Sequence, residues 1–202
     1  MSLRTKVIAA LTGATMLGGA ITGVVQHNEG LSLTAYKDSA GVPTICYGET
    51  KGVKMGQRAT LSDCQQQLIE SAGEHAKALD GLPMQLSNVA LVGSIDFIYN
   101  VGVAGFNGSA VKRHLKGLDY AAAGRAVLDW RYISKYQQKS PGTGWVYKGG
   151  NRWTFDCSQY INGQRNKVCW GLWERRQWQS KAIGNKFNNV NATVSALTKT
   201  GG

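Results

Sequence analysis

Residues 29–48 read EGLSLTAYKDSAGVPTICYG and carry two carboxylates, Glu29 and Asp38. Gly30 is a typical helix stop, apolar and polar residues then alternate as in a half-buried strand, and a second strand begins near Thr44 after a turn. The pattern predicts that Glu29 ends a helix and faces a β-hairpin that carries Asp38. Two carboxylates across a gap suit glycoside hydrolysis, although ordinary surface acids would give the same pattern.

Three blocks, in order, extend this signal along the chain. In the first, eight residues separate Glu29 from Asp38 and five separate Asp38 from Thr44; the others are FIYNVGVAGF at 97–106 and GLWERR at 171–176. Together they resemble phage-type lysozymes, the endolysins of glycoside hydrolase family twenty-four, from about residue 27 to residue 180. The resemblance implies an α+β, lysozyme-like fold, in which a long helix joins a small N-terminal β-hairpin lobe to a mainly helical C-terminal lobe.

The resemblance also implies catalytic roles. Glu29 would be the general acid that protonates the glycosidic oxygen, Asp38 would support the attack of water, and Thr44 would help to hold that water. The family is regarded as inverting, which implies carboxyl groups about 6.5–9.5 Å apart. The expected reaction is hydrolysis of the β-1,4 bond between N-acetylmuramic acid and N-acetylglucosamine in peptidoglycan, leading to lysis of the host cell.

Other residues near the expected cleft follow from the same resemblance. Asn100 is expected to line the sugar cleft, and one arginine of the pair Arg175 and Arg176 to reach the Glu29 region, with Arg176 taken as the substrate-binding one. Where the family commonly carries His after the glycine of the first block, this chain has Glu49. A third carboxylate there either acts on the catalytic acid by like-charge repulsion or points to solvent.

The N-terminus carries an uncharged run of 19 residues, 7–25, preceded by Arg4 and Lys6. Its length is close to that of a membrane-spanning helix, but glycine and threonine dilute its hydrophobicity. It is a cleaved signal peptide, a permanent anchor, or a marginal anchor that leaves the bilayer and joins the soluble fold. No clean A-x-A-like cleavage site lies near Val25, and a rigid helix must lead into Glu29, so the third interpretation is favoured.

This interpretation resembles the signal-anchor-release endolysins of phages that infect Gram-negative bacteria. The resemblance implies a host inner-membrane protein whose N-terminus stays in the cytoplasm and which later moves to the periplasm. Residues 1–26 would be the signal-anchor-release segment, residues 27–183 the catalytic domain, and residues 184–202 a flexible tail.

Capping patterns and apolar spacing predict the remaining helices. They are expected from Ser62 to about Leu79, from Ser87 through Ile98, from Ser109 to Gly117, and from Asp119 to about Tyr132. No cofactor or metal site is expected, because the three histidines, His27, His75 and His114, are scattered.

A segment of about residues 133–170 departs from the compact family pattern and is rich in glycine, lysine and aromatic residues. It is predicted to be an inserted loop or hairpin that stacks on sugar rings, grips the outer membrane, or packs as an extra hairpin. Four cysteines allow three pairings, of which we choose Cys46–Cys64 and Cys157–Cys169; a regulatory thiol at Cys46 is the alternative. Disulfides of this kind fit the periplasm.

The charge is skewed along the chain. The whole sequence has a net charge of +11, but residues 1–100 hold 7 basic and 8 acidic residues, whereas residues 101–202 hold 16 basic and 4 acidic residues and all six tryptophans. The second half therefore predicts an anionic partner, for which peptidoglycan fits and nucleic acid, in the absence of a recognisable module, does not. We expect a monomer. The alternative functions are a lytic transglycosylase, which needs no Asp/Thr pair to hold water, and a basic membrane- or polyanion-binding protein without catalysis.

Overall fold

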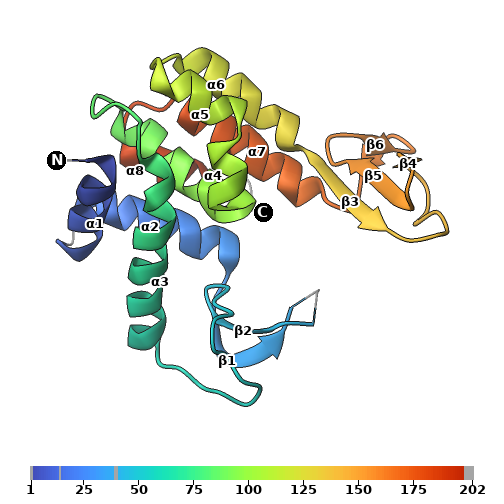
Figure 1. Ribbon diagram of the computed structural model, residues 1–202, viewed down its shortest axis with the longest axis horizontal. Helices are drawn as coiled ribbons and strands as arrows, with labels where there is room; N and C mark the ends of the chain where they lie inside the picture. The colour runs from blue at the N-terminus through green and yellow to red at the C-terminus, as the bar shows by residue number, and fades with distance from the viewer. Residues whose placement is uncertain (1, 14, 39–40, 198–202) are drawn as a thin grey trace.

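The computed structural model describes residues 2–13, 15–38 and 41–197, and it has the expected α+β architecture (Figure 1). A helical body carries two small β-lobes. The helices are α1 Leu3–Thr12, α2 Met16–Glu29, α3 Leu61–His75, the 3-10 helix η1 Ala76–Leu79, α4 Asn88–Asn107, α5 Ala110–Lys116, α6 Tyr120–Val127, the 3-10 helix η2 Leu128–Trp130, α7 Trp170–Ile183 and α8 Val190–Leu197. The strands are β1 Ser32–Lys37, β2 Pro43–Cys46, β3 Tyr132–Tyr136, β4 Trp145–Tyr147, β5 Arg152–Asp156, β6 Tyr160–Ile161 and β7 Gln164–Arg165.

The apolar run 7–25 is divided between α1 and α2, whose axes are bent by 87°. Both helices contribute fully buried side chains, such as Val7 and Val25, to the main hydrophobic core. The helix that leads into Glu29 is therefore made from the apolar run, as expected. It ends where Gly30 takes φ +71°, a left-handed conformation that glycine adopts without a Cβ clash.

Within the described residues, α4 is the one helix long and apolar enough by itself to cross a membrane, and 61% of its apolar window is buried. Its burial among the other helices is typical of the core helix of a soluble protein. The pair α1 and α2 also passes that test, but as a bent pair.

The first β-lobe is the hairpin of β1 and β2. Tyr36 pairs with Thr44 across the antiparallel hairpin, and the register shifts between Ser32 and Tyr36. A disulfide from Cys46 to Cys64 ties β2 to the first turn of α3. The structure therefore has the first predicted pairing, and Cys46, like the other described cysteines, is not a free thiol.

The long helix α3 begins two residues earlier than predicted. Its N-cap is Thr60 and not Ser62, because Thr60 is extended and forms a reciprocal capping box with Asp63: Asp63 N donates to Thr60 Oγ1 (3.1 Å) and Thr60 N donates to Asp63 Oδ2 (2.8 Å). The helix continues through η1 to Leu79, as predicted.

The other predicted caps are confirmed. Ser87, Ser109 and Asp119 each accept a backbone N–H of the following helix. The helix from Asp119 was expected to reach Tyr132, but it ends through η2 at Trp130 because Tyr132 pairs with Asp156 in a sheet.

The predicted insert folds as the second β-lobe. An antiparallel sheet has the order β3-β5-β4, a short hairpin of β6 and β7 follows, and a disulfide from Cys157 to Cys169 closes the segment. Figure 1 shows this lobe projecting from the helical body between η2 and α7. The second predicted disulfide pairing is thus also confirmed.

The segment 184–202, expected to be a flexible tail, contains the helix α8. Val190, Thr193 and Leu197 are buried at helical spacing, and Trp178 Nε1 donates to Thr193 O (2.9 Å). The mainly polar composition of the segment hid this buried face, which has only two apolar residues, Val190 and Leu197. Residues 198–202 of the expected tail lie outside the described residues.

Close approach of α1 to α2 requires a glycine at one position. A Cβ added to Gly18 would lie 2.1 Å from Ala10 O, whereas a Cβ added to Gly19 would meet no atom within 4 Å. The glycines that dilute the apolar run therefore have different structural roles, and Gly18 permits the packing of α1 on α2.

We expect Gly18→Val to destabilise the purified protein by about 2 kcal/mol or more, because the new side chain pushes α1 off α2. Thermal unfolding measures the effect. Gly19→Ala is the matched control and should leave the midpoint unchanged or raise it slightly through helix propensity. Equal midpoints for Gly18→Val and wild type would show that α1 does not pack as described.

Candidate active site

Glu29 is the last residue of α2 and points into a cavity of about 240 Å³. Its side chain is 27% exposed, and a Cβ added to Gly48 would lie 3.9 Å from Glu29 Oε2. Tyr47, His75 and Tyr99 also line the cavity. The acid therefore sits at a helix end where the backbone is fixed and the carboxylate is reachable.

An arginine from α7 holds the Glu29 carboxylate. Arg175 Nη2 donates to Glu29 Oε1 (2.8 Å) and to Asp96 Oδ1 (2.8 Å), and Arg175 Nε donates to Asp96 Oδ2 (3.2 Å). Burial alone would lower the pKa of Arg175, but the charges and hydrogen bonds of Asp96 and Glu29 outweigh burial and raise it. The guanidinium is thus a fixed positive charge beside the candidate acid.

Asp96, on the core helix α4, anchors this arginine. Its side chain is fully buried, and besides Arg175 it accepts from Asn28 Nδ2 (2.9 Å) and Gln179 Nε2 (2.6 Å). Three helices, α2, α4 and α7, therefore meet at one carboxylate. Sequence reasoning missed Asp96, although a lone acid within the apolar run of α4 is the kind of signal that marks a paired buried charge.

Arg176, expected to contact substrate, lies in the interior. It is 3% exposed, and its guanidinium donates to Trp130 O (3.0 Å), to Gln179 Oε1 (2.6 Å) and to Asn100 Oδ1. Burial and the neighbouring charge of Arg175 lower the pKa of Arg176 to about 10, so it remains charged at neutral pH. The arginine that reaches Glu29 is Arg175. Arg176 instead holds the exposed Asn100 by a hydrogen bond to its side-chain oxygen.

Asp38 and Thr44 lie in the β1–β2 hairpin and are joined through Val42. Asp38 Oδ1 accepts from Val42 N (2.8 Å), and Thr44 Oγ1 donates to Val42 O (2.9 Å). Thr44 is buried, and Asp38 is partly exposed where the hairpin turns. Neither Asp38 nor Thr44 lines the 240 Å³ cavity, although Cys46, at the end of β2 in the same hairpin, does.

Glu49 lines the same cavity as Glu29, on the loop after β2. Its Oε1 accepts hydrogen bonds from the backbone N–H groups of Thr50 (2.8 Å) and Lys51 (2.7 Å). These two donors of the same turn stabilise the negative charge of Glu49. On the opposite wall His75 stacks on Tyr99 with ring centroids 4.1 Å apart. Burial raises the pKa of Tyr99, so its hydroxyl stays protonated and donates to Leu68 O (3.3 Å).

Among the described residues, no three His, Cys, Asp or Glu side chains lie close enough together to hold a metal ion. The arrangement around Glu29 consists of carboxylates, one shared arginine and a small cavity. Its chemistry is therefore that of proton transfer and charge stabilisation by side chains.

Comparisons with known proteins identify the family of this chain. A family model described as phage lysozyme matches residues 26–147. The SAR-endolysin of Pseudomonas phage phiKMV is 38% identical over 137 residues, which is 67% of this chain and 84% of that protein. The SAR-endolysin of Escherichia phage N15 is 30% identical over 193 residues, which is 89% of this chain and 95% of that protein.

Solved structures show the same fold. A crystal structure of a P22 lysozyme mutant has a TM-score of 0.56 and 26% identity, covering 82% of this chain and 94% of that chain. An endolysin from Escherichia coli O157:H7 phage FAHEc1 has a TM-score of 0.58 at 21% identity, covering 81% of this chain and 89% of that chain.

Replacing Asp96 with alanine should destabilise the protein by about 3–5 kcal/mol, because Arg175 is then left buried with one partner fewer. Urea unfolding measures the change. Arg165→Ala is the matched control: it removes the ion pair from Arg165 to Glu174 (3.1 Å), whose arginine is exposed, and should cost about 1 kcal/mol or less. Similar losses for the two variants would contradict the anchoring role of Asp96.

Proposed function

This chain belongs to the phage lysozyme family and is a glycoside hydrolase, and on that premise we propose that Glu29, Asp38 and Thr44 are its catalytic residues. The protein is an endolysin muramidase that hydrolyses peptidoglycan for lysis of the host cell. The observation that carries the proposal is the placement of Glu29 at the end of α2, bound to Arg175 and open to a cavity. Asp38 and Thr44 follow on the adjoining hairpin.

In the proposed mechanism Glu29, in its protonated form, gives its proton to the glycosidic oxygen between N-acetylmuramic acid and N-acetylglucosamine. As the bond from the anomeric carbon to that oxygen breaks, a water molecule held in part by Thr44 attacks the anomeric carbon and gives a proton to Asp38, with inversion of configuration. When Glu29 has given up its proton it carries a full negative charge. Arg175 lies 2.8 Å from Glu29 Oε1 and stabilises that carboxylate, so the ion pair favours the product side of the transfer.

We expect Glu29→Gln and Asp38→Asn each to lower the hydrolysis of purified murein about 10²- to 10⁴-fold, because each removes a proton-transfer group while keeping the side-chain shape. Release of soluble muropeptides from sacculi measures the rate. Asp129→Asn, at an exposed acid far along the chain, is the control and should retain the wild-type rate.

The products distinguish hydrolysis from transglycosylation. Mass spectrometry of the wild-type digest should find reducing N-acetylmuramic acid ends. Ends of the 1,6-anhydro type would contradict the hydrolase mechanism, and undiminished lysis by Glu29→Gln would favour a binding protein without catalysis.

We also propose that residues 1–26 act as a marginal membrane anchor before the protein, a monomer, acts in the periplasm. The buried positions of Ile21, Val24 and Val25 support this, because the same side chains that would face lipid complete the core of the folded protein. Glu29 is the last residue of α2. While the apolar run lies in a bilayer, α2 is not packed in the core, and Glu29 is then not held in its folded position. The anchored protein would therefore be inactive, with its N-terminus in the cytoplasm.

In cells expressing the full chain, we expect the protein in the membrane fraction before depolarisation and in the soluble periplasmic fraction afterwards. The active soluble form should keep its N-terminal residues, because they form the helix that supports Glu29. N-terminal sequencing checks this. An active protein that begins at Asn28 or later would contradict the proposal.

A further inference from the structure

The insert lobe, residues 132–169, presents an aromatic surface that the catalytic proposal does not use. In the sheet register, Lys135 pairs with Trp153 and Trp153 with Tyr147, so these three side chains share one face, and Trp145 pairs with Phe155 in the next row of the same face. We define Lys135, Trp145, Tyr147 and Trp153 as the platform. It lies on the part of the sheet that Figure 1 shows projecting from the helical body.

The platform side chains are arranged against one another. The rings of Tyr147 and Trp153 lie 5.1 Å apart, and Lys135 Nζ lies 5.3 Å from the centre of the Trp145 ring. Trp153 Nε1 donates to Gln137 O (3.1 Å), which fixes the indole, while Tyr147 remains 52% exposed. The result is a rigid, partly open aromatic surface with a cation at its edge.

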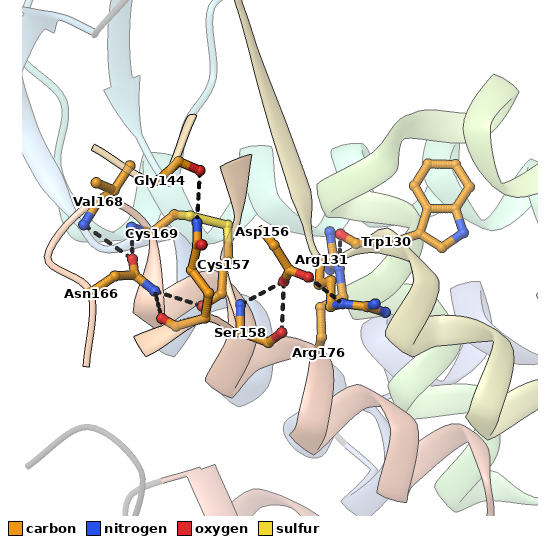
Figure 2. The surroundings of a disulfide bond; sticks show 11 residues. Trp130, Arg131, Gly144, Asp156, Cys157, Ser158, Asn166, Val168, Cys169 and Arg176 are labelled. Atoms are coloured by element: carbon orange, nitrogen blue, oxygen red, sulfur yellow. Dashed lines mark hydrogen bonds and ion pairs between the residues drawn. A yellow bond between two sulfur atoms is a disulfide. The ribbon is translucent and has the colours of Figure 1, made fainter. Parts of the chain in front are cut away.

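Apart from Trp145, whose ring packs on Phe155 with the ring centroids 5.3 Å apart, the fold of the insert lobe rests on residues outside the platform. Phe155 is fully buried on the same sheet face, close to Gly144 and Ile161, and the disulfide Cys157–Cys169 closes the segment. Figure 2 shows Asn166 beside this disulfide, where its Nδ2 donates to Cys157 O (2.8 Å) and its Oδ1 accepts from Cys169 N (2.9 Å). The exposed aromatic rings are therefore not what closes the lobe.

The insert lobe is strongly basic. It holds six basic residues and one acidic residue. The acid, Asp156, is paired with Arg131 at 3.1 Å at the base of the lobe, as Figure 2 shows. Lys148, directly after β4, and Arg152, the first residue of β5, adjoin each other because Lys148 N donates to Arg152 O (2.8 Å), and both are exposed. An anionic ligand complements this surface.

From these contacts we propose that the insert lobe is a second binding site for murein, outside the catalytic cleft. Sugar rings would stack on Tyr147 and Trp153, and stem-peptide carboxylates would bind Lys135, Lys148 and Arg152. The inference rests on the proposed function for its substrate, and it adds a residue set for holding that substrate.

The exposed side chains favour a glycan over a lipid bilayer as the ligand. The large exposed hydrophobic residues of the lobe are four tyrosines and two valines: Tyr132, Tyr136, Tyr147, Tyr160, Val146 and Val168. Tyrosine carries a hydroxyl that needs a polar partner, which a hydroxyl-rich sugar provides and an acyl chain does not. Leucine, isoleucine and phenylalanine, the side chains that insert into lipid, are not among the exposed described residues of this lobe.

The insert lobe is also joined to α7, the helix whose Arg175 binds the candidate acid Glu29. Arg165 Nη1 and Trp170 Nε1 both donate to Glu174 Oε1, each at 3.1 Å, and Glu174 precedes Arg175 on α7. A murein strand bound on the platform is therefore held at a fixed place relative to Glu29. Such tethering raises the local concentration of substrate at the cleft.

The test measures binding separately from hydrolysis. The full chain carrying Glu29→Gln, which leaves sacculi intact, is sedimented with purified murein sacculi over a range of NaCl concentrations. Adding Tyr147→Ala with Trp153→Ala, or adding Lys135→Glu alone, should weaken binding about tenfold. Tyr136→Ala, an exposed aromatic on the opposite sheet face of the same lobe, is the matched control and should bind as its parent does.

Thermal unfolding verifies that each variant is folded, and Lys135→Glu, at an exposed side chain, keeps the test valid where the double variant unfolds. Unchanged sedimentation of Lys135→Glu and of a folded double variant would overturn the proposal. So would platform-dependent binding to phosphatidylglycerol vesicles without platform-dependent binding to sacculi. Muropeptide release by the wild-type chain is measured in parallel, so a failure of the proposed catalytic function is a separate result.

Discussion

The shared ion pair of Arg175 with Asp96 and Glu29 joins three helices of the core at the candidate acid. Asp96 is fully buried on α4, Glu29 ends α2, and Arg175 comes from α7. A buried carboxylate is costly unless it is paired, so Asp96 requires the arginine, and the arginine in turn fixes the partly buried carboxylate of Glu29. The position of the acid therefore depends on the packing of three helices that are far apart in sequence.

Helix α2 has to satisfy two demands at once. Its apolar side chains, among them Ile21 and Val24, complete the core, while its last residue is the candidate acid. Gly18 lets α1 approach closely and at the same time lowers the hydrophobicity of the run. If the run is the membrane anchor that we propose, a more apolar sequence would favour the bilayer and a more polar one would not fill the core, and the mixture of small and branched residues meets both demands.

The charge skew of the chain has a local basis in the structure. Two arginines of the positive second half have partners inside the protein: Arg175 donates hydrogen bonds to Asp96, and Arg176 donates one to Asn100. The six basic residues of the insert lobe are exposed and, apart from Arg165, have no carboxylate partner among the ion pairs of the described residues. Composition alone cannot distinguish buried, paired arginines from exposed basic residues, because each adds one positive charge to the net charge.

The sequence by itself indicated the family, the helix that ends at Glu29 and the caps at Ser87, Ser109 and Asp119, because these depend on short-range patterns. It left three cysteine pairings open, and the tertiary structure has the pair Cys46–Cys64 and the pair Cys157–Cys169 that we chose among them. Only the tertiary structure decided that Thr60 caps α3, that residues 190–197 form a helix, and that Arg175 rather than Arg176 reaches Glu29. Adjacent residues on a helix point about 100° apart. Which one faces the cleft is set by how α7 packs on α4, and a contact between residues 29 and 175 leaves no local trace in the chain.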